Sequence, residues 1–204
     1  MIPLIMLAAG WAVYFVLHSL LASLRTKHWI ERRWPALHRY YRLVYNVIAI
    51  AALVPVLVLL ARSSDGVLLL PRPPYVAILA NVLALAAVAG FVWTLRYYDG
   101  RAFLGLRSEG TGQFTLSPLH RHVRHPWYFL ALIVIWTRPL DAAWLVSALA
   151  ITVYLIIGSR LEDTKLLAEF GEPYRRYRQQ VPGLMPWPGR TLPLTETPRT
   201  GSDR

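Results

Sequence analysis

The sequence contains no cysteine and comparatively few charged side chains. Without cysteine, neither a disulfide framework nor a thiolate metal site is possible. Asp, Glu, Lys and Arg together make up only 16% of the residues, whereas hydrophobic residues make up 55%. Acidic residues are the scarcer sign, with 11 against 22 basic residues and a formal net charge of +11. This composition is typical of a membrane protein. The positions of its few polar residues are therefore the main source of information on its topology and its function.

Long apolar runs account for most of the chain. They cover residues 3–24, 43–61, 75–95, 127–136 and 140–158. A bilayer core of ~30 Å needs ~20 apolar residues as helix, and only helices or closed barrels satisfy the backbone in lipid. The runs are continuous rather than alternating, which favours helices. We therefore predict an all-α integral membrane protein with about five transmembrane helices, the last two forming a helical hairpin. Residues 1–189 are expected to form a single domain, and residues 190–204 a disordered tail rich in Pro, Thr and Arg.

Basic residues predict the orientation. All but three of the 22 Lys and Arg residues lie in the segments 25–42, 96–124 and 160–204. The positive-inside rule places these segments in the cytoplasm. The chain is thus expected to be a multi-pass protein of the bacterial inner membrane, with its N-terminus outside and its C-terminus in the cytoplasm. Because topology explains the positive charge, nucleic acid is not an expected partner; the oligomeric state is not readable from the sequence.

The fourth apolar run begins and ends at proline. Pro126 is suited to the first position of a helix, where its missing N–H is harmless, and it biases His125 toward extended geometry. The free amides of such a first turn form an anion site. Only about 12 residues separate Pro126 from the break at residues 138–139, and at ~1.5 Å each they span ~18 Å, too little for a full crossing. Either the corner at residues 125–126 is recessed into the membrane or the hairpin turns before the far surface, and both alternatives predict a cavity that is open to water and lipid.

The fifth run is expected to continue as helix past Gly158, since its apolar face extends to Phe170. Gly171 is a suitable C-terminal stop. A second, short cytoplasmic helix should follow, with Tyr174 and Tyr177 on one side because they are three residues apart.

Three ordered motifs resemble one known family. They are Arg124-His125-Pro126-x-Tyr128, then Glu162-Asp163-x-x-Leu166, then Phe170-Gly171-x-x-Tyr174-x-x-Tyr177-x-x-x-Val181-Pro182. This pattern resembles the membrane methyltransferases related to isoprenylcysteine carboxyl methyltransferase, which include phospholipid N-methyltransferases and methanethiol S-methyltransferases. It covers residues 117–186, about a third of the chain.

The resemblance implies an enzyme that binds S-adenosylmethionine at the cytoplasmic ends of the last two spans. Carried over by position, the cofactor-binding residues are His125, Pro126, Tyr128, Glu162 and Asp163. Independently of the resemblance, the guanidinium group of Arg124 or Arg160 can orient an acidic acceptor, which makes these two arginines the candidate catalytic residues. The acceptor is expected to be lipidic or a small molecule, with a carboxylate, a thiol or an amine as the methylated group, and membrane lipids are expected partners.

Two features support a second interpretation. Leu130 stands where the family usually has glycine, so a larger side chain is expected to narrow the site. His18-Ser19 and Tyr41-Arg42 resemble NnrU-type membrane proteins, which implies a non-catalytic protein that retains the fold. His18 itself, inside the first run, is either a functional residue or a contact between helices.

Simpler roles exist for several of these residues. The basic residues can be positive-inside anchors, and the aromatic residues can form an interfacial belt. Glu162 and Asp163 can pair with neighbouring basic residues on a hydrated helix. His120, His122 and His125 suggest a metal, but no acidic cluster accompanies them in the sequence, so we expect no metal site.

Overall fold

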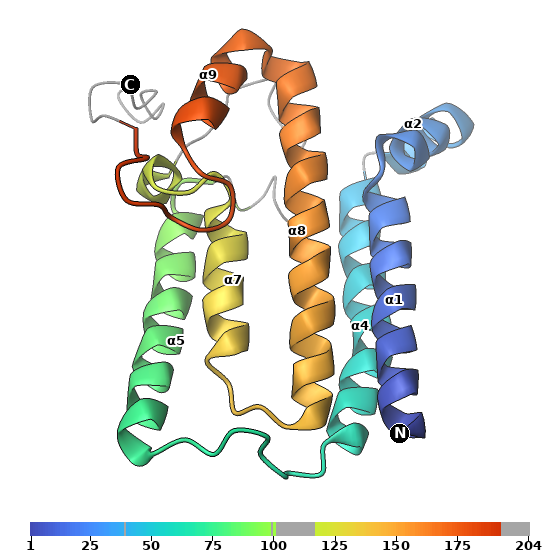
Figure 1. Cartoon of the computed structure of the whole chain (residues 1–204). Helices are drawn as coiled ribbons and strands as arrows, with labels where there is room; N and C mark the ends of the chain where they lie inside the picture. Colours follow the sequence, from blue (N-terminus) through green and yellow to red (C-terminus); the bar gives the residue numbers. More distant parts are fainter. Residues whose placement is uncertain (39, 99, 101–116, 193–204) are drawn as a thin grey trace. The chain divides into compact units, whose positions relative to one another are not determined.

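A computed structural model describes residues 1–192 apart from residues 39, 99 and 101–116 (Figure 1). All regular elements in these residues are helical, as predicted. They are α1 (Ile2–Ala22), α2 (Leu24–Arg33), α3 (Pro35–His38), α4 (Tyr41–Ser63), α5 (Pro74–Leu95), the 3₁₀ helix η1 (Pro118–Arg121), α7 (Pro126–Trp136), α8 (Ala142–Phe170) and α9 (Glu172–Gln180).

Four of these helices are long and apolar enough to cross a membrane, namely α1, α4, α5 and α8. The chain is therefore a multi-pass membrane protein. The fifth apolar helix, α7, has only 11 residues, or ~16 Å of helix. This confirms the prediction that the fourth apolar run is too short for a full crossing.

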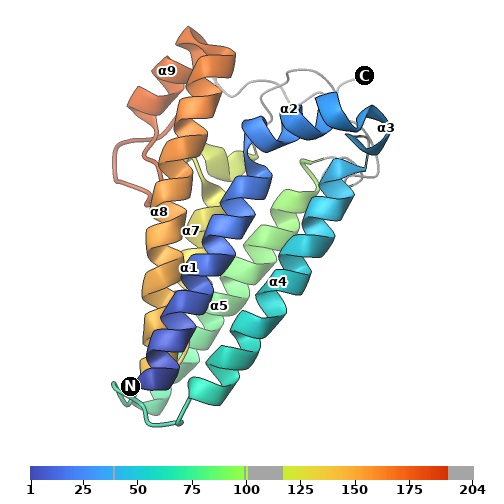
Figure 2. The ribbon, with the colours of Figure 1, turned by 90° about the vertical axis from the view of Figure 1, so that its right-hand side faces the viewer.

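Contacts divide the chain into two compact units, and the first comprises residues 1–71, 99–111 and 139–151. Within it, α1 and α4 lie side by side in both views (Figures 1 and 2). Leu7, Trp11 and Val56 form a buried cluster with Ala143 at the start of α8. Gly10 permits this approach, because a Cβ there would lie 3.1 Å from the side chain of Leu59.

His18 has a hydrogen-bond partner within the same unit. Its Nε2 atom lies 2.7 Å from the hydroxyl of Tyr45 on α4. A polar side chain within the membrane needs such a partner. The pair fits the interpretation of His18 as a contact between helices.

The second unit comprises residues 72–98, 112–138 and 152–204. Here α7 packs against α5 and against the second half of α8. Trp136 at the end of α7 donates its indole N–H to Thr152 Oγ1 at 3.0 Å, and Tyr128 at the other end lies next to Gly158. The two helices thus run antiparallel, which confirms the predicted hairpin.

Beyond α8 the chain turns back onto the hairpin. Gly171 has φ of 59°, a left-handed conformation that favours glycine, and it separates α8 from α9. Tyr174 and Tyr177 are both buried on one side of α9, as predicted, in a cluster with Val181 and Leu192.

The start of the predicted tail is packed rather than free. The N–H of Leu192 donates to the carbonyl of Arg121, and the carbonyl of Leu192 accepts from the guanidinium of Arg121. The buried side chain of Leu192 explains this order, which composition did not predict. The rest of the predicted tail, residues 193–204, lies outside the described residues.

Candidate active site

The site begins at the corner that precedes α7. His125 has φ of −117° and ψ of 70°, and Pro126 occupies the first turn of the helix. The backbone N–H groups of Arg124 and His125 donate to the carbonyls of Pro182 and Gly183 at 2.8 and 3.1 Å. The extended geometry imposed by Pro126 therefore presents this corner to the segment that follows α9.

Two adjacent carboxylates on α8 contact the ring of His125. Its Nδ1 atom lies 3.3 Å from Glu162 Oε2, and its Nε2 atom lies 2.9 Å from Asp163 Oδ1. Both ring nitrogens therefore face acceptors, an arrangement that the doubly protonated imidazolium satisfies. Burial opposes this charge, but the hydrogen bonds to Asp163 and Glu162 outweigh it and raise the pKa of His125.

The two carboxylates differ in what they offer to a ligand. The side chain of Asp163 is only 8% exposed. It accepts from Arg124 Nε and Nη2 at 3.2 and 2.6 Å and from the hydroxyl of Tyr174. The side chain of Glu162 is 47% exposed. Asp163 therefore holds Arg124 and His125 in position, whereas Glu162 can contact a bound molecule.

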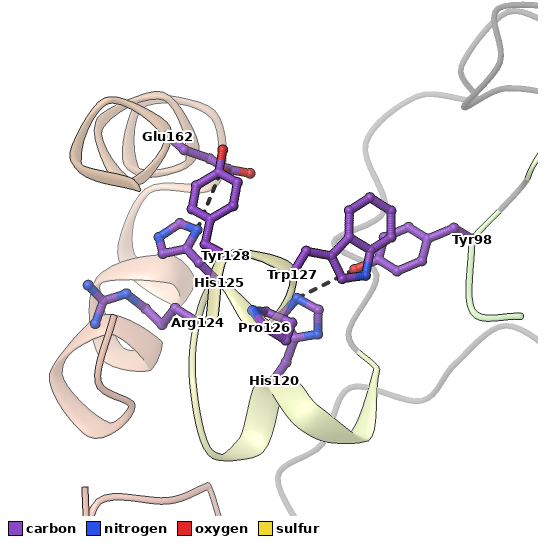
Figure 3. A pocket seen from close by; sticks show the side chains of 8 residues that line it. All are labelled: Tyr98, His120, Arg124, His125, Pro126, Trp127, Tyr128 and Glu162. Atoms are coloured by element: carbon purple, nitrogen blue, oxygen red, sulfur yellow. Dashed lines mark hydrogen bonds and ion pairs between the residues drawn. The ribbon is translucent and has the colours of Figure 1, made fainter. Parts of the chain in front are cut away.

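A cavity of about 280 Å³ opens beside these groups (Figure 3). It is lined by Tyr98, His120, Arg124, His125, Pro126, Trp127, Tyr128 and Glu162. The ring of Tyr128 stacks on that of His125, with centroids 5.5 Å apart and planes 15° apart. The hydroxyl of Tyr128 also hydrogen-bonds to Glu162. This side of the cavity thus combines a carboxylate with an aromatic face, both of which attract cations.

The other side of the cavity is formed by Tyr98 and His120, whose polar atoms face each other (Figure 3). His120 is 8% exposed, and burial lowers its pKa to about 4. Burial, together with the charge of Glu162, raises the pKa of Tyr98 to about 12. Both side chains are therefore neutral at pH 7. Our sequence-based site omitted them, because they lie in separate segments and belong to none of the three motifs.

The structure brings most of the expected site together. Arg124, His125, Pro126, Tyr128 and Glu162 line the cavity, whereas Asp163 lies behind it. Arg160 is exposed and is not among the lining residues. Residues two apart on a helix do not share a face, so Arg160 points away from Glu162.

Leu130 does not narrow the cavity as we expected. It is 8% exposed and is not among the lining residues. A Cβ on Gly90 of α5 would lie 3.5 Å from Leu130 Cδ2. The absence of a side chain at Gly90 thus accommodates Leu130 between α5 and α7.

Comparison with known proteins identifies the family. The methanethiol S-methyltransferase of Mycobacterium tuberculosis is 30% identical over 188 residues, which cover 87% of this chain and 76% of that protein. The chain belongs to the family of the methanethiol S-methyltransferases. A match that covers 87% of the 204 residues necessarily includes the cavity.

Other members of the family match over a shorter stretch. The Pseudomonas deceptionensis methanethiol S-methyltransferase is 41% identical over 76 residues, 37% of this chain and 29% of that protein. The Crocosphaera subtropica methanethiol S-methyltransferase is 38% identical over 95 residues, 46% of this chain and 35% of that protein. The matched region thus spans about a third of the length of these relatives. No protein-family model and no solved structure matches the chain.

Proposed function

We propose that this protein transfers a methyl group from S-adenosylmethionine to a small thiol. The observation that carries the proposal is the cavity in which the carboxylate of Glu162 and the aromatic face of Tyr128 lie beside the imidazolium of His125. Membership of the methanethiol S-methyltransferase family supports both methyl transfer and a thiol acceptor.

The residues of the cavity fit the proposed cofactor. The exposed carboxylate of Glu162 can accept from an ammonium group or from ribose hydroxyls. The face of Tyr128 can stabilise a cation by ~0.5–2 kcal/mol. The first-turn amides that follow Pro126 can hold a carboxylate. S-adenosylmethionine, when bound, supplies the electrophilic methyl group together with its leaving group, so the protein needs mainly to position the reactants.

The size of the cavity indicates what it holds. Small-molecule sites usually measure ~300–1,000 Å³, and this cavity of about 280 Å³ is just below that range. We assign to it the reacting end of the cofactor and a small acceptor. Because the helix α7 is shorter than the apolar core of the membrane, the residues on either side of it complete this crossing, and we further infer that an apolar acceptor reaches the cavity at least partly from the lipid phase.

Binding of S-adenosylhomocysteine to purified protein tests the cofactor assignment. Glu162→Gln keeps the shape of the side chain and removes a charge-assisted contact to the cofactor, whereas Tyr128→Phe keeps the ring and removes the hydroxyl that hydrogen-bonds to the carboxylate of Glu162. A charge-assisted contact typically contributes ~1.5–3 kcal/mol, or roughly ten- to a hundredfold in affinity. Glu169→Gln on the exposed part of α8 and Tyr97→Phe outside the cavity are the matched controls and should bind normally. If both test variants bind as well as the parent, or if the parent itself does not bind, the non-catalytic interpretation replaces this one.

We also propose that the N-terminus faces the outside and the C-terminus the cytoplasm of a bacterial inner membrane. The distribution of basic residues supports this orientation. It places the start of α7 and the end of α8 on the side where S-adenosylmethionine is made. Reporter fusions after Arg42 and after Arg204 should both report cytoplasm, and a periplasmic signal at either point would contradict the orientation.

A further inference from the structure

The Tyr98 and His120 side of the cavity has a defined pattern of hydrogen-bond donors. His120 Nδ1 accepts from the backbone N–H of Ser117 at 3.0 Å and lies 2.9 Å from the Ser117 hydroxyl. A backbone N–H can only donate, so Nδ1 carries the lone pair and the proton of neutral His120 lies on Nε2. That N–H faces the hydroxyl oxygen of Tyr98.

The contact between the Nε2–H of His120 and the hydroxyl of Tyr98 is too long to satisfy either group as a hydrogen-bond donor. The distance between His120 Nε2 and the Tyr98 hydroxyl is 3.5 Å, longer than the ~2.7–3.2 Å of a normal N–H···O hydrogen bond. Two donors at this separation can both reach one large acceptor atom placed beside them. Neither can remove a proton at pH 7, because Nε2 has no free lone pair and Tyr98 remains protonated.

The surroundings of this pair are aromatic. The ring of Trp127 lies 4.8 Å from that of Tyr98, with planes 53° apart, and its indole N–H donates to Thr94 Oγ1 at 2.8 Å. The charged groups of the lining are already paired. Arg124 is held by Asp163 and by the carbonyls of Arg178 and Val181, and the imidazolium of His125 by Glu162 and Asp163. This end therefore offers neutral donors within an apolar wall.

We propose that Tyr98 and His120 bind the thiolate sulfur of the methyl acceptor, with the sulfur accepting from both the O–H of Tyr98 and the Nε2–H of His120. This inference rests on the proposed function. It separates the cavity into two parts, the Glu162 and Tyr128 side for the cofactor and the Tyr98 and His120 side for the acceptor (Figure 3).

The reaction then proceeds in two balanced steps. The thiol first loses its proton to water, since the thiolate is the nucleophile, and the two donors stabilise the resulting anion. A lone pair of the thiolate sulfur then forms the new S–CH₃ bond while the bond between the methyl carbon and the sulfonium breaks. The electron pair of that bond remains on the departing sulfur, which becomes a neutral thioether.

The same arrangement selects among thiols. The acceptor end has donors for one sulfur atom, and its aromatic wall suits a small alkyl group. Arg124 is already paired with Asp163, so a carboxylate on the acceptor would be desolvated without a matching cation. Methanethiol and ethanethiol should therefore be methylated in preference to 3-mercaptopropionate.

Two substitutions in the full-length protein in detergent test the proposal. Tyr98→Phe removes one donor. His120→Asn keeps an acceptor near the Ser117 N–H and removes the other donor. Each should lower kcat/KM for methanethiol by roughly ten- to a hundredfold while S-adenosylhomocysteine affinity stays within about twofold. Tyr97→Phe makes the same chemical change one residue away, where the ring contacts that of Trp93 edge to face, and should behave as the parent.

The pH profile of kcat distinguishes binding of the thiolate from a structural role. kcat reports ionisation within the bound complex, so each tenfold loss of thiolate stabilisation should move the profile up by about one pH unit. An unmoved profile, a kcat/KM within threefold of Tyr97→Phe, or a parallel loss of S-adenosylhomocysteine affinity would each overturn the assignment. If the parent protein binds no S-adenosylhomocysteine, the proposed function fails first, and that result is recognisable before any variant is measured.

Discussion

Replacing Asp163 by asparagine should destabilise the protein more than any other single loss of charge around the cavity. Its buried carboxylate compensates the guanidinium of Arg124 and the imidazolium of His125 and accepts from Tyr174. Asparagine keeps one acceptor oxygen but turns an N–H₂ group toward donors. Removing one partner of a buried ion pair typically costs ~3–5 kcal/mol. For a chain of this size ~1 kcal/mol corresponds to ~2–4 °C in Tm, so we expect Tm to fall by roughly 6–20 °C.

The assay is thermal unfolding in detergent at pH 7, with Glu172→Gln as the control. Glu172 pairs with Arg175 and Arg176 at 3.5 Å on the exposed side of α9, and such surface pairs contribute only ~0–1 kcal/mol. The control should therefore stay within about 4 °C of the parent. If the Tm of Asp163→Asn lies as close to that of the parent as the Tm of the control does, Asp163 is not the compensating charge.

Three further substitutions test neighbouring features. Because the pKa of His125 is raised in the folded state, its protonation stabilises the fold fully below the unfolded pKa of ~6.5. This stability is lost as pH rises through the folded pKa. The Tm of the parent should therefore fall across that pH window, whereas the Tm of His125→Gln should be lower and independent of pH there. Leu130→Ala should lower stability by ~2–5 kcal/mol by opening a void against Gly90, without tightening S-adenosylhomocysteine binding in calorimetry; tighter binding would show that Leu130 narrows the cavity after all. Arg160→Gln should leave kcat and KM unchanged, since Arg160 is not among the residues that line the cavity, and a tenfold loss in kcat would instead support its predicted catalytic role.

Helix boundaries near the site were predictable because single residues determine them. Pro126 starts α7 and Gly171 ends α8 through backbone geometry alone. The proximity of His125 and Glu162 was expected from the resemblance and is present in the structure. These predictions depended on local chemistry or on an ordered motif.

Other parts of the site depend on contacts between distant segments. Tyr98 and His120 are 22 residues apart, and nothing in either local sequence indicates that they meet. Which of the two acidic neighbours faces the cavity depends on the rotation of α8 about its axis, and so does the exclusion of Arg160. The contact between Leu130 and Gly90 likewise requires knowledge of how α5 packs against α7.

The hydrogen bonds between the corner before α7 and the end of the chain have a consequence for biosynthesis. Leu192, which holds Arg121 through its carbonyl, is 71 residues further along the chain. At ~5–20 residues per second, roughly 4–14 s pass between the synthesis of these two residues. For most of that interval the corner at Arg124 and His125 lacks the backbone carbonyls of Pro182 and Gly183. The apolar helices are therefore made before the cavity can close.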